Sequence, residues 1–102
     1  MGSCAEKICT EMTITRQAQD EYAIQSYTRA REASKALEWE IVGVIKQSRK
    51  GEVVYQKDQE VERFAPEQFA RLRPLFAKNG SITTANSSKI ADGACALLLM
   101  SE

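Results

Sequence analysis

Two stretches at the beginning of the chain repeat their apolar positions with the period of an α-helix. The first predicts a short helix over residues 1–12, with an apolar face formed by Met1, Ala5, Ile8, Cys9 and Met12. The second predicts a long helix over residues 16–39, which contains neither Gly nor Pro, with Thr15 as its N-cap. Its expected buried face consists of Ala18, Tyr22, Ala23, Tyr27, Ala30, Ala33 and Leu37. Such a helix would measure roughly 36 Å, so it would overhang a domain whose expected radius of gyration is about 13 Å.

The pattern changes in the middle of the chain. Residues 40–45 (EIVGVI) and 52–55 predict two short strands joined by a polar turn that ends in glycine. Residues 56–62 are polar and mostly acidic, which indicates a loop. A second helix is expected to start at Pro66 and to end near residue 73, because proline suits the first helical turn and a second proline follows. Its expected packing residues are Phe69, Leu72 and Phe76.

The end of the chain differs from the rest. Residues 81–88 (SITTANSS) are small and rich in hydroxyl groups, and an Asp-Gly turn separates them from the apolar run 94–100 (ACALLLM). A continuous apolar run of this length is typical of a strand buried on both faces of a sheet. The remainder of the chain offers only one or two weak strands to such a sheet. Together with the overlong helix, this orphan strand predicts a piece of a larger protein.

Composition excludes several classes of function. Fourteen basic and fourteen acidic residues among 102 give no net charge, whereas nucleic-acid binding depends on clustered Lys and Arg. The absence of His excludes His-based catalysis and His-ligated metal within this chain. The longest apolar run has seven residues, too few to span a bilayer, and no targeting segment is recognised at the start. Cys4, Cys9 and Cys95 are expected to be buried thiols in a reducing compartment.

Three segments together resemble the thiolase family. They are MGSCAE at residues 1–6, TRQAQDEYAIQSYTRA at residues 15–30 and NGSITTANSSKIADGACALLLMS at residues 79–101, and they follow the family's order over essentially the whole chain. Within the family, the resemblance points to the mitochondrial branch that interconverts acetyl-CoA and acetoacetyl-CoA.

The resemblance implies an α+β fragment that forms a partial thiolase N-terminal domain over residues 1–102. Residues 1–78 would be mostly the long helices and short strands of the family's loop domain. Residues 79–102 would be a coenzyme A loop followed by a buried strand of the family's α-β-α-β-α core. The implied chemistry is Claisen condensation, or the reverse thiolysis, of coenzyme A thioesters.

Family thiolases use a nucleophilic Cys, a second Cys and a His, and none of the three is expected in this chain. Cys4 and Cys95 match no catalytic position. The chain alone is therefore expected to be inactive. The implied partners are coenzyme A thioesters and the remainder of a thiolase or other thiolase subunits in a homo-oligomer. The implied location is the mitochondrion, and no covalent cofactor is implied.

Residue by residue, the resemblance also implies a binding site. The residues implied to contact coenzyme A are Arg63, Phe64, Ala65, Ser88 and Tyr27. A potassium ion is implied at Tyr27 and the backbone of the stretch Thr84, Ala85, Asn86 and Ser87. The residue types suit these roles, since guanidinium pairs with phosphate and carbonyl groups bind hard cations. One departure from the mitochondrial pattern is Gln68, which stands in place of a phosphate-binding Lys.

Other interpretations stay open at this point. Taken alone, Arg63 would be a solvated surface charge, Ser88 a turn hydroxyl and Tyr27 a core residue. The alternatives to a thiolase fragment are a non-catalytic module that binds coenzyme A or a thiolase subunit, and a truncated product without function.

Overall fold

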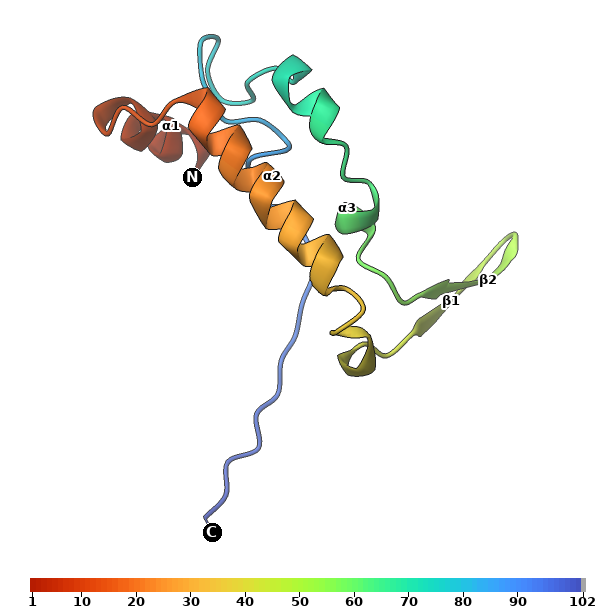
Figure 1. Cartoon of the computed structure of the whole chain (residues 1–102). Helices are drawn as coiled ribbons and strands as arrows, with labels where there is room; N and C mark the ends of the chain where they lie inside the picture. The colour runs from red at the N-terminus through yellow and green to blue at the C-terminus, as the bar shows by residue number, and fades with distance from the viewer. Residues whose placement is uncertain (102) are drawn as a thin grey trace.

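The computed structural model describes residues 1–101 and is an open assembly of short elements around one long helix. In chain order the elements are α1 (Gly2–Glu11), α2 (Arg16–Ala33), η1 (Glu38–Glu40), β1 (Val44–Ser48), β2 (Gly51–Tyr55), α3 (Gln59–Glu62) and η2 (Pro66–Arg71), where η marks a 3-10 helix. Both α3 and η2 lie against α2, whereas the β1–β2 hairpin extends beyond its C-terminal end (Figure 1). None of the helices within residues 1–101 combines the length and the apolar content that crossing a membrane requires.

The beginning of α2 matches the sequence prediction, but its end does not. The Thr15 hydroxyl accepts a hydrogen bond of 3.1 Å from the backbone N–H of Ala18, which confirms the predicted N-cap. The helix stops at Ala33, well before the expected end at residue 39. The reason lies in Ser34, whose hydroxyl donates a 2.8 Å hydrogen bond to the carbonyl of Arg31 and so competes with the helical hydrogen bonds.

The face of α2 that was expected to be buried is only partly covered. Tyr27 is half-buried, but Tyr22 is 75% exposed and Ala18 and Ala30 are exposed as well, so the prediction of a continuous buried stripe was wrong at these three positions. Leu37, beyond the end of the helix, is also exposed. No residue of α2 is fully buried, because only the short elements α3 and η2 and one loop cover it.

The hairpin forms slightly later in the chain than expected. Strands β1 and β2 pair antiparallel, with Val44 opposite Tyr55 and Ser48 opposite Gly51. The first strand therefore runs into the predicted polar turn, which shrinks to two residues before Gly51 with its φ of 115°. Every residue of both strands is exposed, so no buried face requires an alternating pattern and polar residues such as Gln47 can join the strand.

Two further elements differ from the prediction. A single helical turn, α3, occupies the segment expected to be a loop, because the carboxylate of Asp58 caps it by accepting hydrogen bonds from the N–H groups of Glu60 and Val61. The helix that starts at Pro66 is a 3-10 helix that ends at Arg71. Its proline occupies the first turn, as expected.

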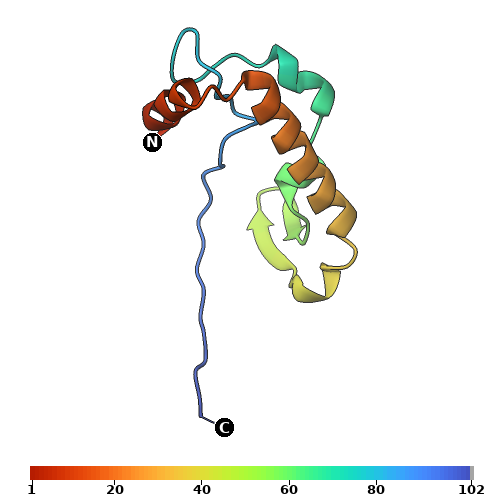
Figure 2. The same cartoon turned by 60° about the vertical axis from the view of Figure 1, so that its left-hand side comes forward.

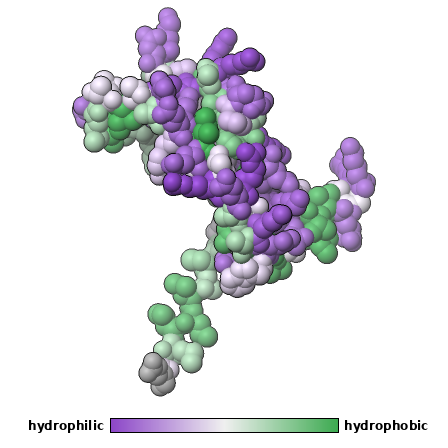
Figure 3. Space-filling view, in the orientation of Figure 1, coloured by the Kyte–Doolittle hydropathy of each residue, from purple (hydrophilic) through white to green (hydrophobic). Residues whose placement is uncertain are grey.

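The buried core is small. Phe69 and Ile82 are its buried apolar residues, and Thr83 is fully enclosed beside them. Many apolar side chains of α1, the hairpin and the C-terminal segment face outward (Figure 3). The radius of gyration is 17.8 Å, compared with about 13 Å for a compact domain of this length.

The apolar run 94–100 forms no buried strand in this structure. Residues 90–101 are extended and run clear of the other elements in both ribbon views (Figure 1 and Figure 2). Leu97, Leu98 and Leu99 are about nine-tenths exposed, and Cys95 is exposed as well. Cys4 is also exposed and Cys9 half-buried, so the prediction of buried thiols was wrong in this structure. Within the described residues, the hairpin is the sheet that the chain forms, and it does not pair with this run.

Candidate functional site

A small cavity of about 170 Å³ lies where α2, α3, η2 and the loop 83–89 meet. It brings together six of the residues that the family resemblance implied. They are Tyr27, Arg63, Phe64, Ala65, Thr84 and Ala85. Because these residues come from three segments that are far apart in the sequence, their meeting at one cavity is a property of the fold.

An aromatic cluster forms one wall of this cavity. The rings of Tyr27 and Phe64 stack nearly parallel, with 5.0 Å between their centroids and 7° between their planes. Phe69 meets both rings edge-on, at centroid distances of 6.3 and 5.9 Å. The guanidinium of Arg31 lies 5.0 Å from the centroid of the Phe64 ring, within the range of a cation–π interaction. Stacked and edge-on pairs of this kind hold the wall in a defined geometry.

Three charged residues form the rim of the cavity. The carboxylate of Glu60 lies 3.9 Å from the guanidinium of Arg63 and 3.3 Å from the ammonium of Lys89. Lys89 also donates a hydrogen bond to the backbone carbonyl of Thr84. The Arg63 side chain is 72% exposed, so it is free to pair with an anion from solution. The three charges sum to one positive charge at the rim.

The loop that follows Gly80 is held by a carboxylate of α1. Glu6 accepts hydrogen bonds from the backbone N–H groups of Ser81 and Ile82 and from the Ser81 hydroxyl. The donated N–H groups, that of Ser81 first and that of Ile82 second, hold the pKa of Glu6 below its usual value of 4.5. A side chain at position 80 would collide with this carboxylate, which explains the glycine there.

A second set of hydrogen bonds joins the same loop to α2 and η2. Asn86 accepts a 2.7 Å hydrogen bond from the N–H of Thr83 and donates one of 2.9 Å to the carboxylate of Asp20. Asp20 in turn accepts a hydrogen bond from Arg16, which also donates to the carbonyls of Phe69 and Leu72 in and after η2. The loop and the aromatic wall are therefore positioned by one continuous polar network.

Three of the expected site residues, Asn86, Ser87 and Ser88, do not line the cavity. Ser88 is exposed and lies just outside it, next to Lys89. Ser87 turns its hydroxyl inward along the loop and donates a 2.7 Å hydrogen bond to the carbonyl of Thr83. No group of three or more His, Cys, Asp or Glu residues that could hold a metal ion occurs among residues 1–101.

Sequence reasoning missed Glu60, Lys89 and Arg31. Lys89 could have been singled out from the sequence, because it is the one basic residue after Lys78 and lies next to the hydroxyl-rich stretch 81–88. Glu60 belonged to a segment expected to be a loop, where its charge had no predicted neighbour. Arg31 was not among the residues of the expected buried face of α2, and the sequence does not show that the ring of Phe64 packs against its guanidinium.

Comparisons with known proteins agree on one family. The profile of the thiolase N-terminal domain matches residues 1–102. A mitochondrial acetyl-CoA acetyltransferase of Xenopus tropicalis is 42% identical over 98% of this chain, and an acetyl-CoA acetyltransferase of Yarrowia lipolytica is 45% identical over 99% of it. The chain spans about a quarter of the length of these relatives, namely 25% and 26%. Several relatives are named mitochondrial and others are not.

Solved structures show the same relationship. An acetyl-CoA acetyltransferase from Syntrophomonas wolfei superposes with a TM-score of 0.76 and 39% identity, covering 88% of this chain and 23% of that one. The human mitochondrial 3-ketoacyl-CoA thiolase superposes with a TM-score of 0.65 and 29% identity, covering 78% of this chain and 21% of that one. The mixed helices and the two-stranded antiparallel sheet therefore match the thiolase fold, and this chain belongs to the thiolase N-terminal domain family.

Proposed function

We propose that this chain is part of a thiolase acyltransferase that interconverts acetyl-CoA and acetoacetyl-CoA by Claisen condensation or thiolysis. The observation that carries the proposal is the match of the thiolase N-terminal domain over residues 1–102, with relatives named acetyl-CoA acetyltransferase at 42–45% identity. In this proposal, residues 1–78 serve mostly as the loop domain, and residues 79–102 supply the coenzyme A loop and a strand for the thiolase core. The remainder of a thiolase and further subunits would complete the enzyme, in the mitochondrion.

The role proposed for this piece is to hold coenzyme A at the cavity beside Tyr27. The exposed guanidinium of Arg63 suits a phosphate group, since it can donate two parallel hydrogen bonds to phosphate oxygens. Phe64 and Ala65 follow it along the same wall, and their apolar surfaces suit the planar base. In this proposal the hydroxyl of Ser88, just outside the cavity, would bond an amide of the pantetheine arm.

Catalysis would come from groups outside the set described above. The chain contains no His that could activate a thiol. None of its cysteines lines the cavity, since Cys4 and Cys9 lie on α1 and Cys95 on the extended segment. We expect the purified chain to show no cleavage of acetoacetyl-CoA. Measurable cleavage that disappears in a Cys4→Ala variant would show that the nucleophile had been assigned wrongly.

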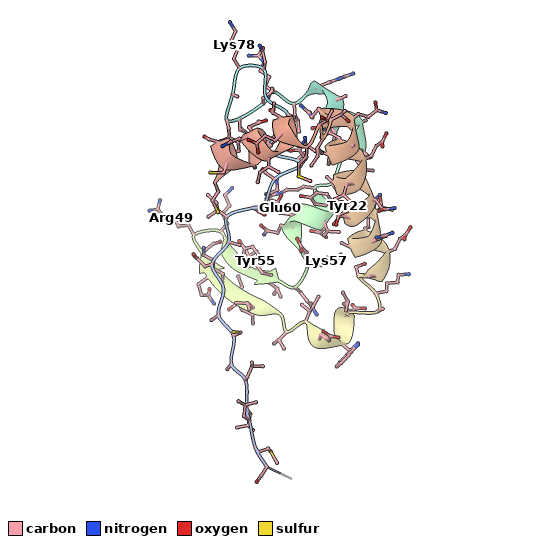
Figure 4. All side chains as sticks on the ribbon, turned by 90° about the vertical axis from the view of Figure 1, so that its left-hand side faces the viewer. Tyr22, Arg49, Tyr55, Lys57, Glu60 and Lys78 are labelled. Atoms are coloured by element: carbon pink, nitrogen blue, oxygen red, sulfur yellow. The ribbon has the colours of Figure 1, made fainter. Side chains whose placement is uncertain are left out.

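Binding of coenzyme A tests the proposed role directly. We expect isothermal titration calorimetry to show weak binding, with a dissociation constant on the order of 1 mM, which corresponds to roughly 4 kcal/mol. Arg63→Ala should weaken it further and flatten its dependence on salt, because a phosphate contact is lost. Arg49→Ala is the matched control, since Arg49 lies in the hairpin turn, away from the cavity (Figure 4).

The comparison between the two arginine variants decides the outcome. Equal loss of affinity in Arg63→Ala and Arg49→Ala would mean that the binding depends on the overall charge of the chain and not on a specific contact with Arg63. Tight binding that ignores Arg63 would place the ligand elsewhere on the chain.

A further inference from the structure

In the loop beside Tyr27, one of the backbone carbonyls implied to bind a potassium ion, that of Thr84, already has a partner. Such a site would need open carbonyl oxygens, yet the carbonyl of Thr84 accepts a hydrogen bond from the Lys89 ammonium. An additional cation at Thr84 would also lie beside a fixed positive charge. A potassium ion at Thr84 would therefore have to replace the Lys89 ammonium as the partner of this carbonyl.

We propose that the ammonium of Lys89 serves as the monovalent cation of this site, an inference that rests on the coenzyme A function proposed above. An ammonium is a compact single charge with three donors, which makes it a chemical substitute for a potassium ion among oxygen ligands. Two of its ligands are visible, the carbonyl of Thr84 and the carboxylate of Glu60 at 3.3 Å. They come from two different segments, so Lys89 links the loop to α3.

Tethering by Lys89 has a consequence for the ligand site. Thr84 and Ala85 line the cavity together with Tyr27, and Ser88 follows them in the same loop. Because Lys89 fixes the Thr84 carbonyl, the loop keeps its position beside the aromatic wall without an ion from solution. Lys89 is in this sense a positioning residue, and coenzyme A binding should be equally strong in potassium, sodium and choline salts.

Titration of the isotope-labelled 102-residue chain with potassium chloride tests this assignment. Choline chloride holds the ionic strength constant, and the backbone amide resonances of residues 84–88 are followed by NMR. The wild-type amides should not distinguish potassium from sodium or choline. Lys89→Met should create a saturable response that potassium elicits more strongly than sodium, because the vacated carbonyl becomes available. Lys89→Arg keeps the charge and should remain unresponsive.

The matched control is Lys78→Met, which removes a lysine from a loop tip far from Glu60 (Figure 4). It should behave as the wild type does. A saturable, potassium-selective response of the wild-type chain would overturn the proposal, and this arm does not depend on the stability of any variant. A Lys89→Met chain that keeps the wild-type loop resonances and ignores potassium would overturn it as well.

A coenzyme A titration of the same samples separates this proposal from the proposed function. If coenzyme A binds the wild type but only in potassium, the role of Lys89 is refuted and the coenzyme A site stands. If coenzyme A binds no sample while Lys89→Met alone responds to potassium, Lys89 keeps its assigned role and the coenzyme A function of the cavity is refuted.

Discussion

Glu6 is the residue on which the position of the loop 81–88 depends most directly. The N–H groups of Ser81 and Ile82 stabilise its carboxylate and lower its pKa below 4.5. A lowered folded-state pKa stabilises the fold above the unfolded-state pKa, and this contribution is lost as the pH falls through the folded value. We expect the Ser81 and Ile82 amide resonances to stay constant above pH 4.5 and to shift as the pH falls below it.

Glu6→Gln should remove that acid transition, because the amide cannot titrate. Glu11→Gln is the matched control on the same helix, where Glu11 makes only an exposed ion pair with Lys7 at 3.7 Å. An acid transition of the two amides that persists in Glu6→Gln would mean that another group controls the loop.

Single residues were predictable where their role is local. The N-cap at Thr15 follows from the residue type next to a periodic segment, and the structure confirms it. Of the two ion pairs of Glu60, only the one with Arg63, three positions away, could have been predicted from the sequence. The pair with Lys89 could not, because Lys89 lies 29 positions further along the chain. A sequence pattern carries no signal for a contact that depends on how two loops return to the same helix.

The stability of α2 depends on its first turn more than on burial. No residue of the helix is buried, so the cap and the pairs Arg16–Asp20 at 2.7 Å and Gln17–Glu21 at 2.9 Å carry much of the local order. We expect Thr15→Ala to destabilise the chain by about 1 kcal/mol in urea titrations followed by circular dichroism. Thr15→Ser keeps the accepting hydroxyl and should cost only a few tenths of that value. Equal losses in both variants would argue against the cap.

At the level of elements, type was more predictable than extent. Both long helical segments and both strands occur in the predicted order, since their periodicity is encoded locally. The end of α2 and the single turn of α3 were missed because they depend on the side-chain hydrogen bonds of Ser34 and Asp58, which compete with backbone bonds only in one geometry.

The whole molecule exposes more apolar surface than its own elements can cover. The sequence predicted that the run 94–100 is a strand whose sheet the rest of the chain does not supply. In the structure the run is extended and contacts no other element. This feature was foreseeable, since a strand that is apolar on both faces needs a covered sheet that the remaining sequence does not contain. The hydrophobic periodicity did not predict the position of the cavity. Only the family resemblance indicated which residues would meet there.

The exposed run predicts the solution behaviour of the purified chain. A continuous apolar segment with no charge and no proline is prone to association when it has no partner. We expect the wild-type chain to bind a dye specific for apolar surfaces and to associate with rising concentration. Leu98→Lys should reduce both effects at little cost in stability, because Leu98 is 89% exposed and packs against nothing. Ile82→Lys is the contrasting variant, since Ile82 is only 6% exposed and its replacement should destabilise the chain. A monomeric wild-type chain with a sharp cooperative melt and no dye binding would show that the run 94–100 is covered in solution.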